Sequence, residues 1–226
     1  MAYFRGPRII TDNLLTYVDA GNTKSYPLTG VTMYDLVDGV NGTLTNGPVY
    51  SGTNMGSILL DGINDTIEMG NSTNTDFSNV LPWSFSFTFK TNVLPAADVD
   101  FLRKGSSTTT GFFMFYRSPT ASASTVGQVF IRHNGTTRYA GTVDVTGVNM
   151  ITVTYAGSGN MECYVNGVYL GNFGVMTGYS TGTALQLGLG NIYLNGYVYN
   201  FMKYTKQLSA SEVLQNYNAI RTRFNQ

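Results

Sequence analysis

The sequence has little of what disulfide-bonded, metal-dependent and nucleic-acid-binding proteins need. Its 226 residues include one cysteine and one histidine, which excludes both an internal disulfide and a cluster of His and Cys ligands around a metal. Charged residues make up 12% of the chain and the formal net charge is zero, whereas globular domains usually contain roughly 25% charged residues. Because phosphate recognition needs a basic patch, we expect no nucleic-acid partner.

Long hydrophobic runs are also missing. No apolar run approaches the ~18 residues of a membrane-spanning helix, and the opening residues Met1–Arg8 contain no hydrophobic segment typical of a secretory signal. We therefore expect a protein without a membrane partner that is made and folded in a cytosol.

The residues that the chain does contain favour β-strands, since it is rich in threonine, tyrosine, phenylalanine and valine. In the segment 83–89, aromatic residues alternate with serine and threonine, which predicts one buried face and one face lined by hydroxyl groups. Two Asn-Gly pairs, Asn134 with Gly135 and Asn166 with Gly167, predict tight hairpins. A turn-rich stretch spans residues 21–57. The expected strands are 14–19, 57–62, 66–69, 83–89, 111–116, 128–133, 136–143, 151–155, 161–165, 168–170, 185–188 and 196–204.

One helix is expected, at the C-terminal end. Ser209 and Glu212 have the spacing of a capping box, and Leu208 and Val213 are placed for a hydrophobic staple. Apolar residues then recur on one helical face, which predicts packing against the core. That face consists of Val213, Tyr217, Ile220 and Phe224. Many short strands and a single helix indicate one all-β domain, either a sandwich or a barrel.

Several segments, in this order and spacing, resemble concanavalin A-like and laminin G-like jelly-roll domains. They are residues 15–22, 60–65, 164–168 and 195–219. The resemblance implies a two-sheet antiparallel jelly-roll sandwich over residues 13–226, closed by the short C-terminal helix and preceded by an N-terminal arm at residues 1–12. Met33 stands where these domains often have tryptophan.

The opening segment Tyr3–Ile9 resembles versions of this domain carried by tailed bacteriophages, especially those of cyanobacteria and marine hosts. The resemblance implies a virion surface protein, either a capsid decoration protein or a component of a tail fibre. Its partners would be capsid or tail proteins and host surface polysaccharide, and it would form a homo-oligomer or bind to the virion lattice. The alternative is a free-standing, lectin-like module that binds carbohydrate.

The arm contains the candidate partner-binding residues Tyr3, Phe4, Arg5 and Arg8. Aromatic residues and arginine are enriched at the energetic centres of protein interfaces. Chain termini are also commonly frayed, and the sequence leaves both interpretations open.

Catalysis is not expected. Enzymes of this fold that hydrolyse β-glucans resemble one another in a strand carrying E-x-D-x-E, which places two carboxylates beside the substrate. The three glutamates of this chain, Glu68, Glu162 and Glu212, form no such motif. His133 is expected to be a solvated residue beside a hairpin turn, without a catalytic partner. A glycan hydrolase is therefore the least favoured hypothesis.

Three further features have a structural and a functional interpretation. Asp61, Asn64 and Asp65 offer oxygen ligands for Ca²⁺, but the same residues commonly shape a turn. Trp83 is a candidate platform for a sugar, although its phase in the strand favours the core. Cys163 alternates with apolar residues, which predicts a buried, unreactive thiol. We expect that no cofactor is required and that Ca²⁺ is an optional ligand.

Overall fold

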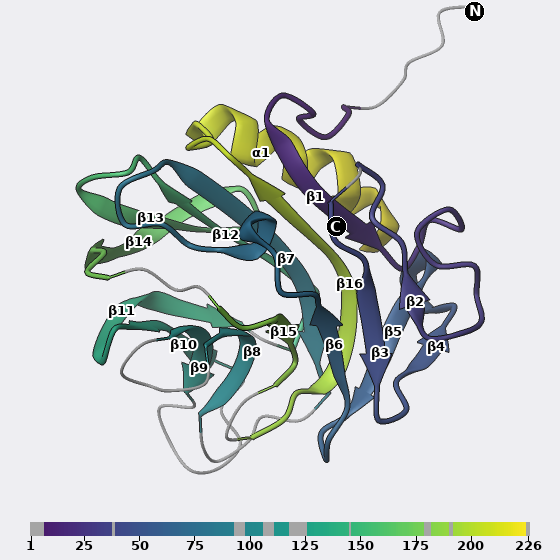
Figure 1. The fold of residues 1–226 in the computed structure, drawn as a ribbon. Coiled ribbons are helices and arrows are strands. Elements are labelled where there is room, and N and C mark those ends of the chain that lie inside the picture. The colour runs from purple at the N-terminus through teal and green to yellow at the C-terminus, as the bar shows by residue number, and fades with distance from the viewer. Residues whose placement is uncertain are drawn as a thin grey trace, which may run out of the picture.

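The structure is a computed structural model that describes residues 7–37, 39–92, 98–105, 111–117, 126–144, 146–178, 182–189 and 192–224. Within these residues, the strands form two eight-stranded antiparallel sheets, and one helix near the C-terminus covers the outer face of one sheet (Figure 1). The prediction of an all-β sandwich with a short C-terminal helix is confirmed. The predicted boundary of the domain at residue 13 stays a prediction.

The first sheet has the strand order β14-β13-β12-β7-β16-β5-β4, with β1 also paired to β16. One edge of β16 pairs with β7, whereas the other edge is shared, because residues 200–204 pair with β1 and residues 195–198 pair with β5. The strands are β1 (Leu14–Asp19), β4 (Val49–Ser51), β5 (Ser57–Asp61), β7 (Trp83–Thr91), β12 (Asn149–Tyr155), β13 (Asn160–Val165), β14 (Val168–Val175) and β16 (Asn195–Tyr204).

The second sheet has the strand order β11-β10-β9-β8-β15-β6-β3-β2. Its strands are β2 (Thr32–Met33), β3 (Gly42–Thr45), β6 (Thr66–Met69), β8 (Val99–Lys104), β9 (Phe112–Arg117), β10 (Val126–His133), β11 (Thr136–Asp144) and β15 (Leu185–Leu187). Three short 3₁₀ turns complete the described elements, namely η1 (Thr53–Met55), η2 (Thr73–Thr75) and η3 (Arg221–Phe224).

Both predicted hairpins are confirmed. Asn134 and Gly135 have φ values of 45° and 75°, and Asn166 and Gly167 have φ values of 51° and 81°, as a type I′ turn requires. The turn-rich stretch 21–57 was predicted without strands, but it contains β2, β3 and β4. These strands are two to four residues long, too short for a period-two pattern to stand out, and β8 was also missed.

The main hydrophobic core lies between the two sheets. From β7, Trp83 and the three phenylalanines of the strand all point into it. The hydroxyl-lined face of the same strand is buried as well, although the sequence predicted only that it would be polar. Ser84 accepts a hydrogen bond from the Leu208 N–H, Ser86 bonds Thr152, and the Thr88 hydroxyl donates to Asn200.

A third layer explains that burial. Helix α1 (Ala210–Ile220) and η3 pack a second apolar cluster onto the outer face of the first sheet. Ile9 and Ile10, which precede β1, join this cluster. The layer is also held by polar contacts, because Arg223 in η3 donates to both carboxylate oxygens of Asp19, at 2.8 and 2.9 Å, and to the Gly56 carbonyl at 3.0 Å.

The capping box predicted for the helix is confirmed. The Ser209 Oγ accepts a hydrogen bond from the Glu212 N–H at 3.3 Å, and the Glu212 carboxylate accepts one from the Ser209 N–H at 2.9 Å. These bonds satisfy donors at the start of the helix that would otherwise lack partners.

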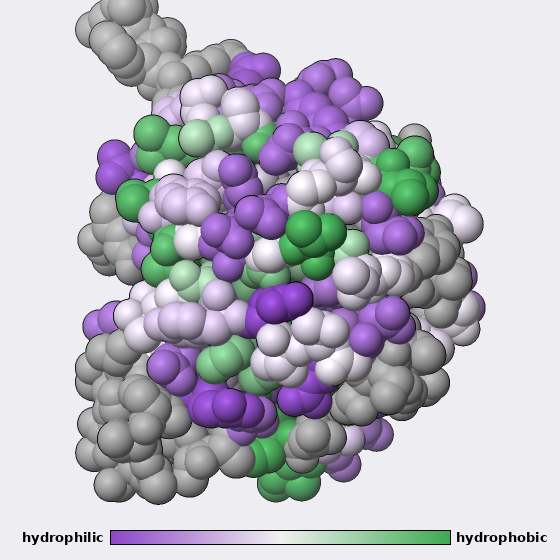
Figure 2. Space-filling model, turned by 90° about the vertical axis from the view of Figure 1, so that its left-hand side faces the viewer, coloured by the Kyte–Doolittle hydropathy of each residue, from purple (hydrophilic) through white to green (hydrophobic). Residues whose placement is uncertain are grey.

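The edge strands β11 and β14 of the two sheets lie against each other. Glycine permits this approach, because a Cβ added at Gly171 would lie 2.1 Å from the Ala140 carbonyl oxygen, and one added at Gly141 would lie 2.6 Å from Leu170. Figure 2 views the molecule from this side, and its coloured residues show separate hydrophobic patches among hydrophilic ones.

The prediction for His133 is wrong and the prediction for Cys163 is confirmed. The His133 side chain is 2% exposed, and its Nδ1 accepts a hydrogen bond from the Thr177 N–H at 3.2 Å. His133 is the last residue of β10, and the turn starts at the next residue. Its side chain therefore follows the alternation of the strand and points inward, as those of Val129 and Ile131 do. Cys163 is a buried free thiol whose pKa is raised by burial.

Three charged side chains are buried near the end of β16. The Lys104 Nζ lies 2.8 Å from the Asp76 carboxylate and donates to the Thr75 Oγ1 at 2.7 Å. Lys203 is 3% exposed, and its Nζ donates to the Asn74 carbonyl at 2.9 Å. Burial lowers the pKa of Lys203 to about 8, nearby Lys104 acts in the same direction, and Asp76 opposes both.

We expect Ser209→Ala to lower the free energy of unfolding by about 1 kcal/mol, because the capping bond to the Glu212 N–H is lost. Urea denaturation measures the change. Ser211→Ala is the matched control, because the Ser211 hydroxyl bonds only the Ser209 hydroxyl among the described residues. Equal losses in the two variants would contradict the assignment of the cap.

We expect Lys203→Met to raise the free energy of unfolding at pH 7 by about 3 kcal/mol, because a folded-state pKa near 8 lies below the ~10.4 of an unfolded lysine. The cost of burying the charge is complete below pH 8. This cost shrinks as the pH rises from 8 to about 10.5. In that interval Lys203 is already neutral in the folded protein but is still charged in the unfolded chain. The advantage of the methionine variant should shrink over the same interval.

Urea denaturation at several pH values from 7 to 10 measures this difference. Lys24→Met removes an exposed lysine and should show little difference at any pH. A methionine variant at position 203 that is less stable at pH 7, or an advantage that does not change with pH, would contradict the assignment.

Candidate functional site

The outer face of the second sheet carries a row of polar side chains that crosses its strands. Gln186 on β15 lies directly opposite Glu68 on β6 and opposite Arg103 on β8. All three are half-buried, while their neighbours along each strand point into the core. The row continues to Thr43 on one side. On the other side Phe113 interrupts it, and Arg132 and Thr137 follow.

A hollow of about 360 Å³ lies over the centre of this row. Besides Glu68, Gln186 and Arg103, it is lined by Gly105, Thr183, Ala184 and Leu189. Neighbouring strands are about 4.8 Å apart, so a carboxylate, an amide and a guanidinium stand at regular intervals along one wall. Together they offer hydrogen-bond donors and acceptors to a ligand that has both, such as a polyhydroxylated one.

Arg103 is held in place in the hollow. Its Nε donates to the Gly105 carbonyl at 3.1 Å, and its guanidinium carbon lies 4.9 Å from the centre of the Phe113 ring. A guanidinium that is stacked and bonded in this way loses little further freedom on meeting a ligand.

The same face continues as an arginine–aromatic surface, formed by Phe115, Arg117, Phe130, Arg132 and Tyr139. The Phe115 and Phe130 rings are stacked 5.3 Å apart, and Tyr139 lies 5.3 Å beyond Phe130. Arg132 lies over Phe115 and Arg117 lies over Phe130. Tyr139, which is 46% exposed, gives this surface an accessible aromatic ring.

The predicted arm residues lie on the other side of the sandwich or outside the described residues. Tyr3, Phe4 and Arg5 are outside them. Arg8 is exposed, and its carbonyl accepts a hydrogen bond from Gln215 in α1 at 2.9 Å. Two residues later, the Ile10 N–H donates to Asn216 in the same helix. The described start of the chain therefore lies in the helix layer (Figure 1).

Asp61, Asn64 and Asp65 lie together in the turn after β5. The Asp61 Oδ1 accepts hydrogen bonds from the N–H groups of Ile63 and Asn64, at 2.8 and 3.3 Å, and these bonds lower its pKa. The Asp65 Oδ2 accepts one from the Asp61 N–H, and burial raises the pKa of Asp65. Both carboxylates thus shape the turn, and Ca²⁺ binding there stays a prediction.

Clusters of three or more His, Cys, Asp or Glu side chains placed to hold a metal are absent from the described part of the chain. Across the same residues, no helix is long and apolar enough to cross a membrane.

The three glutamates lie on three different elements, β6, β13 and α1. Glu68 is the only carboxylate among the described residues that line the hollow. Glu162, on β13 of the first sheet, accepts a hydrogen bond from the Tyr164 hydroxyl at 2.8 Å. Glu212 belongs to the capping box. Glycosidases usually place two carboxyl groups about 5–10 Å apart.

Trp83 is a core residue, as its phase in the strand predicted. It is buried, its Nε1 donates to the Ser78 carbonyl at 2.8 Å, and its ring meets Phe77 and Phe112 edge to face.

The sequence model of the concanavalin A-like lectin/glucanases superfamily matches residues 61–214. The chain belongs to this superfamily. The matched region runs from the end of β5 into helix α1, so it includes Glu68, Arg103, Gln186 and the capping box. This confirms the concanavalin A-like jelly-roll fold that the sequence resemblance implied. No curated protein matches the chain.

Solved structures share the fold of this superfamily member at low sequence identity. Trypanosoma rangeli sialidase in complex with sialic acid is 13% identical, with a TM-score of 0.70 over 96% of this chain and 35% of the sialidase chain. Domain 4 of an extracellular GH43 arabinanase from Geobacillus stearothermophilus, in complex with arabinotriose, is 13% identical, with a TM-score of 0.66 over 94% and 99% of the two chains.

The binding domain of Paraclostridial Mosquitocidal Protein 1 is 14% identical, with a TM-score of 0.69 over 92% of this chain and 52% of that one. The chain thus spans about a third of the sialidase and nearly all of the arabinanase domain.

The sequence did not predict that Glu68, Gln186 and Arg103 form a row in this domain of the lectin superfamily. The only local signal of the row is a single polar residue between apolar neighbours, as at Glu68 within residues 66–69 and Gln186 within residues 185–187. That pattern predicts an outward side chain, but the register that aligns β6, β15 and β8 joins distant segments of the chain.

Proposed function

We propose that this domain is a non-catalytic module that binds glycans on the outer face of its second sheet. The observation that carries the proposal is the row of Glu68, Gln186 and Arg103 along one wall of a hollow. Each sugar hydroxyl both donates and accepts a hydrogen bond, so it can use an amide, a carboxylate or a guanidinium. On the same face, three strands from β8, the exposed ring of Tyr139 on β11 offers an apolar surface to a sugar ring.

The comparisons support this proposal only through the fold. The solved arabinanase domain is in complex with arabinotriose, and the solved sialidase is in complex with sialic acid. A likeness of this kind makes a carbohydrate ligand a reasonable first class to test.

The presence of a single carboxylate in the described lining of the hollow supports a role without catalysis. Glu68 would act as a hydrogen-bond acceptor, because the described lining of the hollow provides no second carboxylate to serve as its acid or nucleophile partner. The polar row itself consists of protein side chains, so the proposed binding needs no cofactor, and Ca²⁺ at Asp61 would be an addition to it.

A virion surface is the proposed setting, and it rests on the resemblance of residues 3–9 to the opening of phage proteins. One geometric fact supports it. The chain enters the domain in the helix layer, which covers the outer face of the first sheet (Figure 1), whereas the hollow lies over the outer face of the second sheet. Capsid or tail proteins that bound the arm would therefore leave the proposed glycan face directed outward, in a homo-oligomer or on a lattice.

We expect the protein to bind a subset of oligosaccharides on an array of neutral and acidic glycans. Gln186→Ala and Arg103→Met should each weaken that binding roughly tenfold, as expected for the loss of one or two hydrogen bonds. Calorimetry with the best glycan measures the loss, and thermal unfolding shows that each variant is folded. Glu68→Gln keeps the size of the side chain and should weaken binding less.

Glu162→Gln is the matched control on the first sheet and should leave binding unchanged. Binding should also survive a chelator, and incubation should release no reducing sugar. Equal affinities in all variants would contradict the site, and release of reducing sugar would contradict the non-catalytic role.

We expect deletion of residues 1–6 to abolish incorporation into the assembling particle. The deletion leaves the bonds of Arg8 and Ile10 to α1 intact, so the melting temperature should not change. Deletion of residues 1–12 is the less clean test, because it removes those bonds. Incorporation is measured by the amount of protein that copurifies with particles, and the truncated protein should keep its glycan binding. Unchanged incorporation would refute the role of Tyr3, Phe4 and Arg5.

A further inference from the structure

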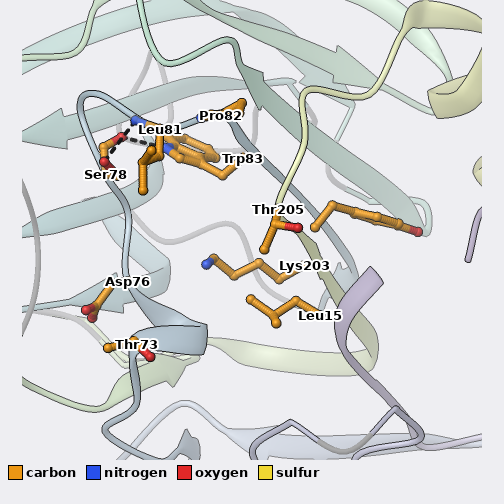
Figure 3. A pocket seen from close by; sticks show the side chains of 10 residues that line it. Leu15, Thr73, Asp76, Ser78, Leu81, Pro82, Trp83, Lys203 and Thr205 are labelled. Carbon is orange, nitrogen blue, oxygen red and sulfur yellow. Dashed lines mark hydrogen bonds between the residues drawn. The ribbon is translucent and has the colours of Figure 1, made fainter. Parts of the chain in front are cut away.

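A second cavity, of about 200 Å³, lies at the end of β16 beside the start of β1. The segment that leads from η2 into β7 forms its other wall (Figure 3). Its rim consists of exposed residues, so the cavity is open to solvent. They are Thr73, Leu81, Pro82 and Thr205.

The base of this cavity holds a buried ammonium group. Figure 3 shows Lys203 extended between Trp83 and Leu81 on one side and Leu15 on the other, with its amino group directed toward the side of Asp76. Its Nζ has one hydrogen bond, to the Asn74 carbonyl at 2.9 Å, and lies 5.5 Å from the centre of the Phe77 ring. An ammonium group has three N–H donors, and within the described residues no second acceptor meets this one.

Among the described residues, the buried charges around Lys203 do not balance. Lys104 and Lys203 bring two ammonium groups, whereas Asp76 brings one carboxylate, and the Asp76 carboxylate lies 2.8 Å from Lys104. A buried ion is costly unless it is paired with an opposite charge. One monovalent anion beside Lys203 would make the group neutral.

We propose that this cavity binds a small carboxylic acid with an apolar body. The carboxylate would meet the Lys203 Nζ, and the body would lie against Leu15, Leu81, Pro82 and Trp83. The volume corresponds to about seven water molecules at ~30 Å³ each, which suits an acid of the size of benzoate. The nearby Asp76 carboxylate disfavours a dianion such as phosphate.

This site goes beyond the proposed glycan binding and is separate from it. Among the described residues, the cavity shares no lining residue with the hollow over Glu68, Gln186 and Arg103. Loss of either activity therefore leaves the other measurable.

Benzoate is the probe, and calorimetry at pH 6.5 should give a Kd of about 1 mM or lower. Acetate has the carboxylate without the body and should bind more weakly. Benzamide has the body without the charge and should bind at least tenfold more weakly. Glucuronate distinguishes the acidic group of a sugar from a free apolar acid, and it should also bind more weakly than benzoate.

Lys203→Met should weaken benzoate binding at least tenfold, because the cation is lost while the bulk of the side chain remains. Lys24→Met, at an exposed position, should not change it. Affinity should be nearly constant from about pH 6 to 7, where benzoate and the ammonium group are both charged, and should fall about tenfold per pH unit well above pH 8, as the ammonium group loses its proton. Among the described residues, Asp76 and Lys104 are the charged groups that act on Lys203. If their own titration changes benzoate affinity, the affinity of the Lys203→Met variant will also depend on pH.

Absence of benzoate binding to the unmodified protein at pH 6.5 would overturn the proposal. Equal benzoate affinity in Lys203→Met, or equal binding of benzamide, would overturn it as well. Tighter binding of glucuronate than of benzoate would contradict the proposal that the ligand has an apolar body, and would indicate an acidic sugar as the ligand.

Discussion

The antiparallel pairing of β7 with β16 is the interaction on which most of the structure depends. Both strands are buried on both faces, so they connect all three layers of the molecule. On one face, Phe87 and Phe201 are register partners in the core between the sheets. On the other face, Ser86 is paired with Met202, which packs under the helix. The second sheet, the helix layer and the cavity at Lys203 are all positioned by this pair.

The sequence predicted those parts of the fold that depend on neighbouring residues. The alternation in β7, the two Asn-Gly hairpins and the capping box at Ser209 are local, so they could be identified without the tertiary structure. The burial of Ser84, Ser86 and Thr88 could not, because the helix that packs on this face comes from residues more than a hundred positions away in the chain. His133 was misplaced for a similar reason, since the strand register and not the adjacent turn decides its direction.

The candidate site was the least predictable part. Glu68, Gln186 and Arg103 come from three strands that are distant in sequence, and only the register of the second sheet brings them into one row. The sequence drew attention instead to the arm and to Asp61, Asn64 and Asp65, whose residue types are conspicuous. Those three residues do lie together, but the Asp61 and Asp65 carboxylates are occupied by backbone N–H groups of their own turn.

The contact between β11 and β14 has a consequence for the molecule in crowded surroundings. A sheet edge with free N–H and C=O groups can recruit a strand from a neighbouring molecule, which leads to edge-to-edge aggregation. Here Gly141 and Gly171 let the two edges approach so closely that each shields the other. A strand from a neighbouring molecule is therefore excluded from these two edges, which leaves β4 and β2 as the other ends of the two sheets among the described strands. A single side chain introduced at Gly171 would separate β11 from β14 and remove that protection.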